Sequence, residues 1–369
     1  MIYLRADGNA VTGAGHLMRC LTIAEELNRL PETAGKVVFL CADEASAILV
    51  RDNGFPVVVL GTDYLQMDTE LAVLEQYFAG QLPDENGCYS GMDKDRVFLV
   101  DSYHVTDRYL KGLAEYGTVF LLDDLGRECR PVDGVINYNA FAQEGYYRRL
   151  YQKQPGTQLL IGSSYVPVRR QFLNVPYTVK EACEQLLITT GGGDSENIAG
   201  RILEAIYRPG VQYHVVVGQF SPHFAWWQQR EQELSGLQLH YNVKDMAGLM
   251  GQCDLAVTAG GTTIYELAAI GVPFVCFSYA ENQEALVRYV GEKQIAGYGG
   301  AYHLEREQTI QNIAELVRLA LADAGKRRGW NLAEKNMIDG LGARRIAACI
   351  AKQSAVPGES TSAERMQQE

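Results

Sequence analysis

Short apolar runs alternate with amphipathic stretches along most of this chain, and the alternation predicts its architecture. In the first half, the apolar runs expected to form strands are 2–5, 36–41, 56–60, 96–100, 119–122, 135–136 and 159–161. Stretches with helical periodicity separate them, among them 17–30, 45–52 and 108–116. Strands that are apolar on both faces and joined by helices indicate a parallel sheet covered on both sides.

The alternation stops at 163–178, which contains two prolines and no periodicity, and then restarts. Beyond this predicted linker, strands are expected at 186–189, 213–217, 237–241, 255–258 and 274–277, and helices at 195–207, 222–234, 245–251, 263–270 and 305–323. The pattern therefore predicts an α/β protein with two Rossmann-like, doubly wound domains, residues 1–165 and 180–330, that face a cleft. A C-terminal helix is expected over 331–352, followed by a polar, disordered tail over 354–369.

Composition and charge narrow the possible partners. The 369 residues carry a formal net charge of −12, which argues against a nucleic-acid partner because phosphate contacts need clustered basic residues. We find neither an apolar run long enough to span a membrane nor the pattern of a signal peptide, so we expect a cytoplasmic protein with no membrane partner. The eight cysteines form no CxxC pair and are expected to be free thiols.

The segment 80–95 is polar and rich in turn residues, and we expect it to form a surface insertion. Its Asp93-Lys94-Asp95 superficially resembles a metal-binding DxD motif, but these acids flank a loop and not a phosphate cradle. Since no other cluster has the spacing of metal ligands, no metal and no cofactor are expected.

Ligands in open α/β sheets bind at the carboxyl ends of strands, and the first such loop contains a histidine. After the first predicted strand, Gly15 permits close approach of the backbone to a ligand, and His16 follows near the start of a helix. His16 is a candidate general acid or base, or alternatively a helix cap. Arg19 lies one turn later, where it faces either the ligand or a surface partner, Glu25 or Glu26.

The second loop, 190–197, contains three consecutive glycines and Ser195 as a candidate helix cap. Exposed backbone amides in such a loop form an anion-binding nest. Because the loop lacks the lysine of a P-loop and the spacing of GxGxxG, it disfavours NTP hydrolysis and NAD binding.

The third loop joins a strand to a helix through two glycines and two threonines. Amides and hydroxyls at Gly261, Thr262 and Thr263 lie where the helix dipole favours phosphate. Glu266, one turn later, is placed to accept both hydroxyls of a ribose. The alternative is that Thr263 and Glu266 form a capping box. Uracil contacts are expected near 243–246 by fold alone.

Together these loops resemble the nucleotide-sugar enzymes of the glycosyltransferase B-type fold. Within that group the chain is most similar to the hydrolases of pseudaminic acid biosynthesis, which release UDP from UDP-2,4-diacetamido-2,4,6-trideoxy-β-L-altropyranose. The resemblance covers residues 2–290. It rests on the ordered motifs Arg5-Ala6-Asp7, Gly13-Ala14-Gly15-His16-Leu17-Met18-Arg19, Val100-Asp101-Ser102-Tyr103, Leu122-Asp123-Asp124, Asn137-Tyr138-Asn139-Ala140, Gly162-Ser163-Ser164-Tyr165, Arg169-Arg170-Gln171-Phe172, Gly191-Gly192-Gly193-Asp194, Gly260-Gly261-Thr262-Thr263, Glu266 and Glu281-Asn282-Gln283.

The resemblance implies His16 and Tyr103 as catalytic residues. The substrate-binding residues that it implies are Arg5, Asp7, Gly15, Arg19, Asp101, Asn139, Arg169, Gly192, Gly193, Gly261, Thr262, Thr263, Glu266, Asn282 and Gln283. Water would attack the anomeric carbon without a metal, His16 would orient or deprotonate that water, and helix N-termini would stabilise the departing diphosphate. We therefore expect a monomer that acts on a UDP-sugar in the pathway to flagellin glycosylation.

Two departures from the family leave alternatives open. Gly193 stands where the family has serine or threonine, and the insertion at 80–95 is unusual. A glycosyltransferase of the same fold would need an acceptor surface on the first domain, where 65–78 instead carries Asp68, Glu70 and Glu75. A non-catalytic subunit that binds nucleotide sugars would need no histidine at position 16.

Overall fold

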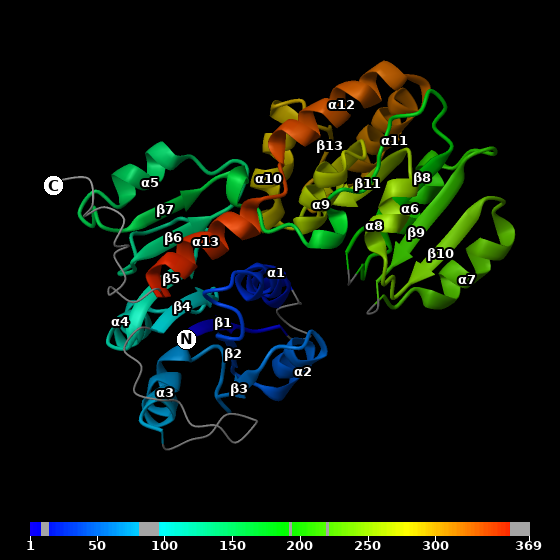
Figure 1. The fold of residues 1–369 in the computed structure, drawn as a ribbon. Coiled ribbons are helices and arrows are strands. Elements are labelled where there is room, and N and C mark those ends of the chain that lie inside the picture. The colour runs from blue at the N-terminus through cyan, green and yellow to red at the C-terminus, as the bar shows by residue number, and fades with distance from the viewer. Residues whose placement is uncertain (9–14, 81–95, 192–193, 219–220, 355–369) are drawn as a thin grey trace. The chain divides into compact units, whose positions relative to one another are not determined.

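A computed structural model describes residues 1–8, 15–80, 96–191, 194–218 and 221–354, and the chain divides into two compact units (Figure 1). The first unit combines Met1–Pro167 with the segment that begins at Leu341, and the second is Val168–Gly340.

The first unit is built on a seven-stranded parallel sheet of order β3-β2-β1-β4-β5-β6-β7. Its strands are β1 (Ile2–Ala6), β2 (Val37–Cys41), β3 (Val57–Val59), β4 (Arg96–Asp101), β5 (Gly117–Leu122), β6 (Gly134–Asn137) and β7 (Gln158–Ile161). Its helices are α1 (Gly15–Arg29), α2 (Glu44–Asp52), α3 (Glu70–Phe78), α4 (Asp107–Ala114), α5 (Glu144–Leu150) and α13 (Gly342–Ser354). Helices α3, α4 and α5 pack on one face, and α1, α2 and α13 lie against the other, so every residue of β1, β2 and β4 is buried.

The second unit has a six-stranded parallel sheet of order β10-β9-β8-β11-β12-β13. Its strands are β8 (Gln185–Thr189), β9 (Gln212–Val217), β10 (Leu237–Tyr241), β11 (Leu255–Ala259), β12 (Phe274–Ser278) and β13 (Gly297–Ala301). Its helices are α6 (Ile198–Ile206), α7 (Phe224–Glu233), α8 (Met246–Gln252), α9 (Thr262–Ile270), α10 (Glu281–Glu292), α11 (Arg306–Ala322) and α12 (Ala324–Met337). Side chains of α6 and α11 share one buried core with the sheet.

The predicted fold class of two Rossmann-like domains is confirmed, since both sheets follow the doubly wound strand order. Short 3₁₀ turns at Ser163–Tyr165 and Arg170–Phe172 lie within the predicted linker. Among the described residues no helix is long and apolar enough to cross a membrane, and the described cysteines are free thiols.

The single helix expected over 331–352 is instead two helices that belong to different units. Helix α12 ends at Met337, and Gly340 then adopts a φ of +74°, a conformation that ends a helix and favours glycine. Helix α13 begins at Gly342, where an added Cβ would lie 2.2 Å from the carbonyl oxygen of Val166. The chain thus returns to the first unit through a close backbone contact that only glycine permits.

Candidate functional site

Each sheet has one point where the strand order reverses, and most of the predicted site residues lie there. In the first sheet it falls between β1 and β4, and in the second between β8 and β11. The carboxyl ends of strands at such a point form the crevice where ligands bind in open α/β sheets.

In the first unit, His16 lies beside the end of β4. His16 is inside helix α1, not at its cap, so the capping alternative is wrong. Its Nδ1 is 3.6 Å from Oδ1 of Asp101, a charge contact longer than a hydrogen bond. The ring meets that of Tyr103 edge to face, with centroids 4.7 Å apart. Tyr103 is 50% exposed, and a Cβ added at Gly15 would meet no described atom within 4 Å. In the described part of the chain, the surroundings of His16 are therefore open to solvent on this side.

Arg19 fixes the carboxylate that His16 faces. Its Nε and Nη2 donate to the two oxygens of Asp101 at 2.5 Å each, and its Nη1 donates to Asp124 at 2.9 Å and to the hydroxyl of Tyr138 at 2.6 Å. Such two-pronged, charge-assisted pairing is strong and geometrically specific. Arg19 is buried, so the predicted surface pair with Glu25 or Glu26 does not form.

Asp124 is the member of this cluster that sequence reasoning left without a role. It accepts from the hydroxyl of Tyr103 at 3.0 Å, and its backbone oxygen accepts from the side chain of Asn139 at 3.2 Å. Burial raises the pKa of Tyr103, so its phenol is a neutral donor at physiological pH. Asp124 is the second residue after β5, and the rule that polar residues at strand ends form sites would have identified it.

Arg5 requires a correction. The side chain is fully buried, donating to Glu70 at 2.8 and 2.5 Å and to Asp7 at 2.5 Å. A guanidinium with no exposed surface does not contact substrate directly. Asp7 also accepts from the amide of Ala42 at 2.8 Å, so Arg5 acts by holding Asp7 in place.

In the second unit, the predicted anion site is the turn between β11 and α9. Gly261 adopts a φ of +156°, and a Cβ at Gly260 would lie 2.8 Å from Cβ of Gln283. Both positions therefore require glycine. The exposed Gly261 and Thr262 present the start of α9, where no side chain caps the helix. The capping-box alternative is therefore wrong, and Thr263, the second residue of α9, is half-buried.

Glu266 is paired with another predicted site residue. Nε and Nη2 of Arg169 donate to the same oxygen, Oε1, at 3.1 and 2.7 Å. Burial raises the pKa of Glu266, while Arg169 opposes that rise.

The two remaining loops carry the other predicted groups. The N-cap residue of α6 is Asn197, and Asp194, not Ser195, accepts from the first amides of the helix, those of Ile198 and Ala199, at 2.7 and 2.8 Å. Gly192 and Gly193 lie outside the described residues, as does the Asp93-Lys94-Asp95 segment.

At the start of α10, Gln283 accepts from the amide of Tyr279 at 3.0 Å, and Asn282 is exposed. Among the described residues no group of three or more His, Cys, Asp or Glu side chains has the arrangement to hold a metal ion.

No family model matches the chain. It is 27% identical over 231 residues to the spore coat polysaccharide biosynthesis protein SpsG of Bacillus subtilis, covering 61% of this chain and 66% of that protein. It is 22% identical over 337 residues to the Methanocaldococcus jannaschii protein MJ1062, covering 85% and 64%. Each match spans slightly less than two thirds of the relative.

Solved structures share the fold over nearly the whole chain. MurG of Acinetobacter baumannii superposes with a TM-score of 0.64 at 13% identity, covering 95% of this chain and 99% of that one. The UDP-GlcNAc 2-epimerase of Neisseria meningitidis bound to UDP-GlcNAc gives 0.62 at 12% identity, covering 95% and 100%. The calicheamicin glycosyltransferase CalG4 gives 0.58 at 13%, covering 97% and 99%. At these identities the likeness establishes the glycosyltransferase B-type fold.

Proposed function

We propose that the protein is a hydrolase that releases UDP from a UDP-2,4-diacetamido-2,4,6-trideoxy-hexose of the pseudaminic acid pathway. The observation that carries the proposal is the grouping of His16, Asp101 and Tyr103 at the strand-order reversal of the first sheet. The similarity to SpsG, a polysaccharide biosynthesis protein, supports a role in sugar metabolism.

The nucleotide is assigned to the second unit. The uncapped start of α9, at Gly261, Thr262 and Thr263, offers amides and a positive dipole end to the diphosphate. Glu266 would accept the ribose hydroxyls through Oε2 or by sharing Oε1 with Arg169. The exposed Asn282 would add a polar contact.

The chemistry is assigned to the first unit. His16 takes a proton from water as the water oxygen bonds to the anomeric carbon, and the bond from that carbon to the diphosphate oxygen breaks. UDP leaves with the electron pair, and the sugar is released with a new hydroxyl. Asp101, held by Arg19, faces the imidazolium that forms, in the way that a carboxylate orients a catalytic histidine. The neutral phenol of Tyr103 is a hydrogen-bond donor beside the reacting centre.

The decisive experiment incubates the purified protein with the UDP-diacetamido sugar alone and follows free sugar and UDP. Release of both in equal amounts supports hydrolysis. Release of UDP only after an acceptor is added would contradict it and identify a glycosyltransferase. Failure to bind any UDP-sugar would overturn both enzymatic functions.

One observation favours the glycosyltransferase as the second candidate. The acidic character of 65–78 argues against an acceptor surface there, but Glu70 is fully buried against Arg5 and contributes no surface charge. In the same segment Leu65 is exposed. This face is therefore less acidic than the sequence alone indicates.

A further inference from the structure

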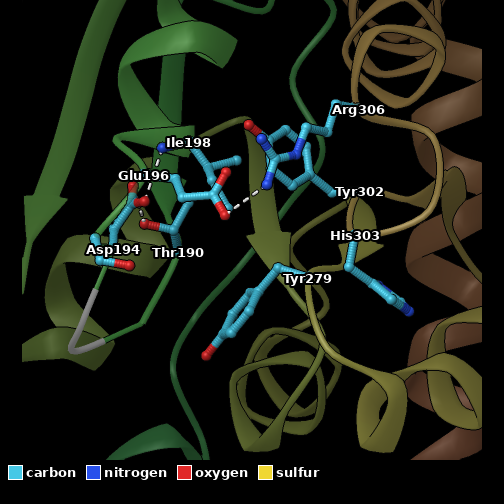
Figure 2. A pocket seen from close by; sticks show the side chains of 9 residues that line it. Thr190, Asp194, Glu196, Ile198, Tyr279, Tyr302, His303 and Arg306 are labelled. Carbon is cyan, nitrogen blue, oxygen red and sulfur yellow. Dashed lines mark hydrogen bonds and ion pairs between the residues drawn. The ribbon is translucent and has the colours of Figure 1, made fainter.

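The second unit contains a cavity that the proposed function has not used (Figure 2). Its volume is about 130 Å³, and residues of the β8–α6 loop, the end of β12 and the β13–α11 connection line it. The lining residues that matter here are Thr190, Ser195, Ile198, Tyr279, Tyr302 and Arg306. Since about 10–15 Å³ of such volume is enough for one water molecule, the cavity has room for a small chemical group.

The cavity adjoins the glycine loop after β8 and the start of α10, two segments for which the sequence predicts substrate-binding residues. Thr190 belongs to the glycine loop after β8, and its hydroxyl donates to Asp194 at 3.0 Å. A Cβ built on Gly191 would lie 3.9 Å from the hydroxyl oxygen of Tyr279. Tyr279 also donates its amide to Gln283 at the start of α10. Tyr279 thus forms a wall between the glycine loop and α10, next to where a sugar diphosphate is proposed to bind.

The charged groups at the cavity already have partners. Arg306 pairs with Glu196 at 2.9 Å, as the dashed line in Figure 2 marks. Asp194 is occupied by the amides of α6, and the hydroxyl of Tyr302 accepts from Arg201 at 2.6 Å. A charged ligand would have to break one of these pairs, whereas a neutral group would leave them intact.

The rest of the wall combines apolar groups, hydroxyls and the imidazole of His303. Ile198 and the rings of Tyr279 and Tyr302 offer apolar contact, and Ser195 and Tyr279 contribute hydroxyls. Nε2 of His303 pairs with Glu284 at 2.8 Å, and its buried Nδ1 has no hydrogen-bond partner among the described residues. A group that suits this wall combines a methyl with a neutral donor and acceptor. The acetamido group has these three features and fits the volume.

We propose that this cavity binds an acetamido substituent of the sugar, which makes it the specificity pocket for N-acetylated nucleotide sugars. The inference rests on the proposed function, because it needs a nucleotide sugar at the neighbouring loops. It assigns recognition of the sugar to Tyr279, Ser195 and the β13–α11 connection, beyond the residues already given roles.

Two variants test the pocket in opposite ways. Ser195 is exposed, so Ser195→Phe should be tolerated by the fold while its larger side chain fills the cavity. Tyr279→Ala removes the side chain that forms one wall of the cavity. Phe224→Ala is the matched control, since Phe224 is 47% exposed and Tyr279 is 40% exposed in the same unit. The ligands are UDP, UDP-N-acetylglucosamine and UDP-glucose, and the last two differ only by an acetamido against a hydroxyl group.

The wild type is expected to bind UDP-N-acetylglucosamine about tenfold or more tightly than UDP-glucose, because a site built for one polar group rejects an analogue that lacks it. In both pocket variants this ratio should fall to about one, with the Kd of UDP unchanged and Phe224→Ala like the wild type. If wild type and variants show the same ratio while UDP-sugars still bind, the pocket inference is wrong and the proposed function stands. If the variants lose affinity for UDP itself, the cavity serves the nucleotide and the inference is overturned. If the wild type binds no UDP-sugar, both proposals fall.

Discussion

At the scale of single residues, buried charge pairs organise the first unit. Arg19 neutralises Asp101, and Arg5 neutralises Glu70 and Asp7, all with little or no exposed surface. Such pairs contribute little net stability, but they fix geometry, because removing one partner leaves an uncompensated charge. The consequence is that Arg19 holds both oxygens of Asp101 in an orientation that places Oδ1 3.6 Å from Nδ1 of His16.

That orientation leads to a prediction for His16. His16→Ala is expected to lower kcat about 10²- to 10⁴-fold by removing the general base, while the Kd of UDP stays unchanged. His104→Ala, an exposed histidine next to Tyr103, is the control and should retain full activity. Steady-state turnover of the UDP-diacetamido sugar is the measurement. Full turnover by His16→Ala would remove its assigned role.

The raised pKa of Glu266 leads to a prediction for the pH dependence of UDP-sugar binding. Because burial raises its pKa, the carboxylate that would accept the ribose hydroxyls becomes neutral at a higher pH than an ordinary glutamate, whose pKa is 4.5. Affinity for UDP-N-acetylglucosamine should therefore fall as pH falls through this raised pKa, with a midpoint above 4.5. Titration calorimetry across this range measures it. Glu266→Gln cannot ionise and should bind weakly with a flat profile, and a wild-type profile equally flat would contradict the assignment.

At the scale of elements, the turns position the candidate groups. A Cβ at Gly260 would lie 2.8 Å from Gln283 and 2.9 Å from Val287, so α10 packs directly on the β11–α9 turn. The close packing of α10 on this turn therefore requires glycine at position 260.

Gly260→Ala should force these elements apart. Overpacking of this kind costs about 1–3 kcal/mol, and the displaced turn should weaken UDP binding about tenfold. Gly156→Ala is the matched control, since a Cβ there meets nothing within 4 Å and no positive φ is required. Urea denaturation and UDP titration of both variants provide the comparison. Equal affinity in the two variants would show that the turn does not hold the nucleotide.

The elements also show what the sequence can predict. Strands buried on both faces, such as β1 and β4, stand out as continuous apolar runs, and so the doubly wound order was predictable. Strand β13, with the sequence GYGGA, has no apolar run and was missed, because α11 and β12 hold it in place through tertiary contacts. Likewise, Ser195 and Asp194 are equally suitable residue types for a helix cap, and only the folded structure shows that Asp194 makes the hydrogen bonds.

The candidate site was predictable in part for a related reason. His16 and Asp101 follow from the rule on strand ends, which needs only the order of elements. The burial of Arg5 does not follow, because its partner Glu70 lies 65 residues away and only the folded chain brings the two together. Ion pairs between distant segments leave no periodic signal in a sequence.

At the scale of the whole molecule, the chain enters the second unit once and then returns to complete the first. The segment from Leu341 belongs to the first unit, where α13 packs against α1 and β4. The C-terminal end of the described chain thus covers the helix that carries His16. Stability of the candidate catalytic unit should therefore depend on residues that follow the entire second unit in sequence.

Ile346, fully buried in α13, tests this dependence. Ile346→Ala should destabilise the first unit by about 2–5 kcal/mol through the cavity it leaves, because close-packed neighbours relax only partly. Hydrogen exchange should show faster opening of the amides of β1, β4 and α1, while those of β8 and β11 keep wild-type protection. Leu332→Ala in α12, where the side chain is 64% exposed, should change neither set. If Ile346→Ala instead accelerates exchange equally in both sheets, the two units unfold as one cooperative body, and α13 stabilises the whole chain and not the first unit alone.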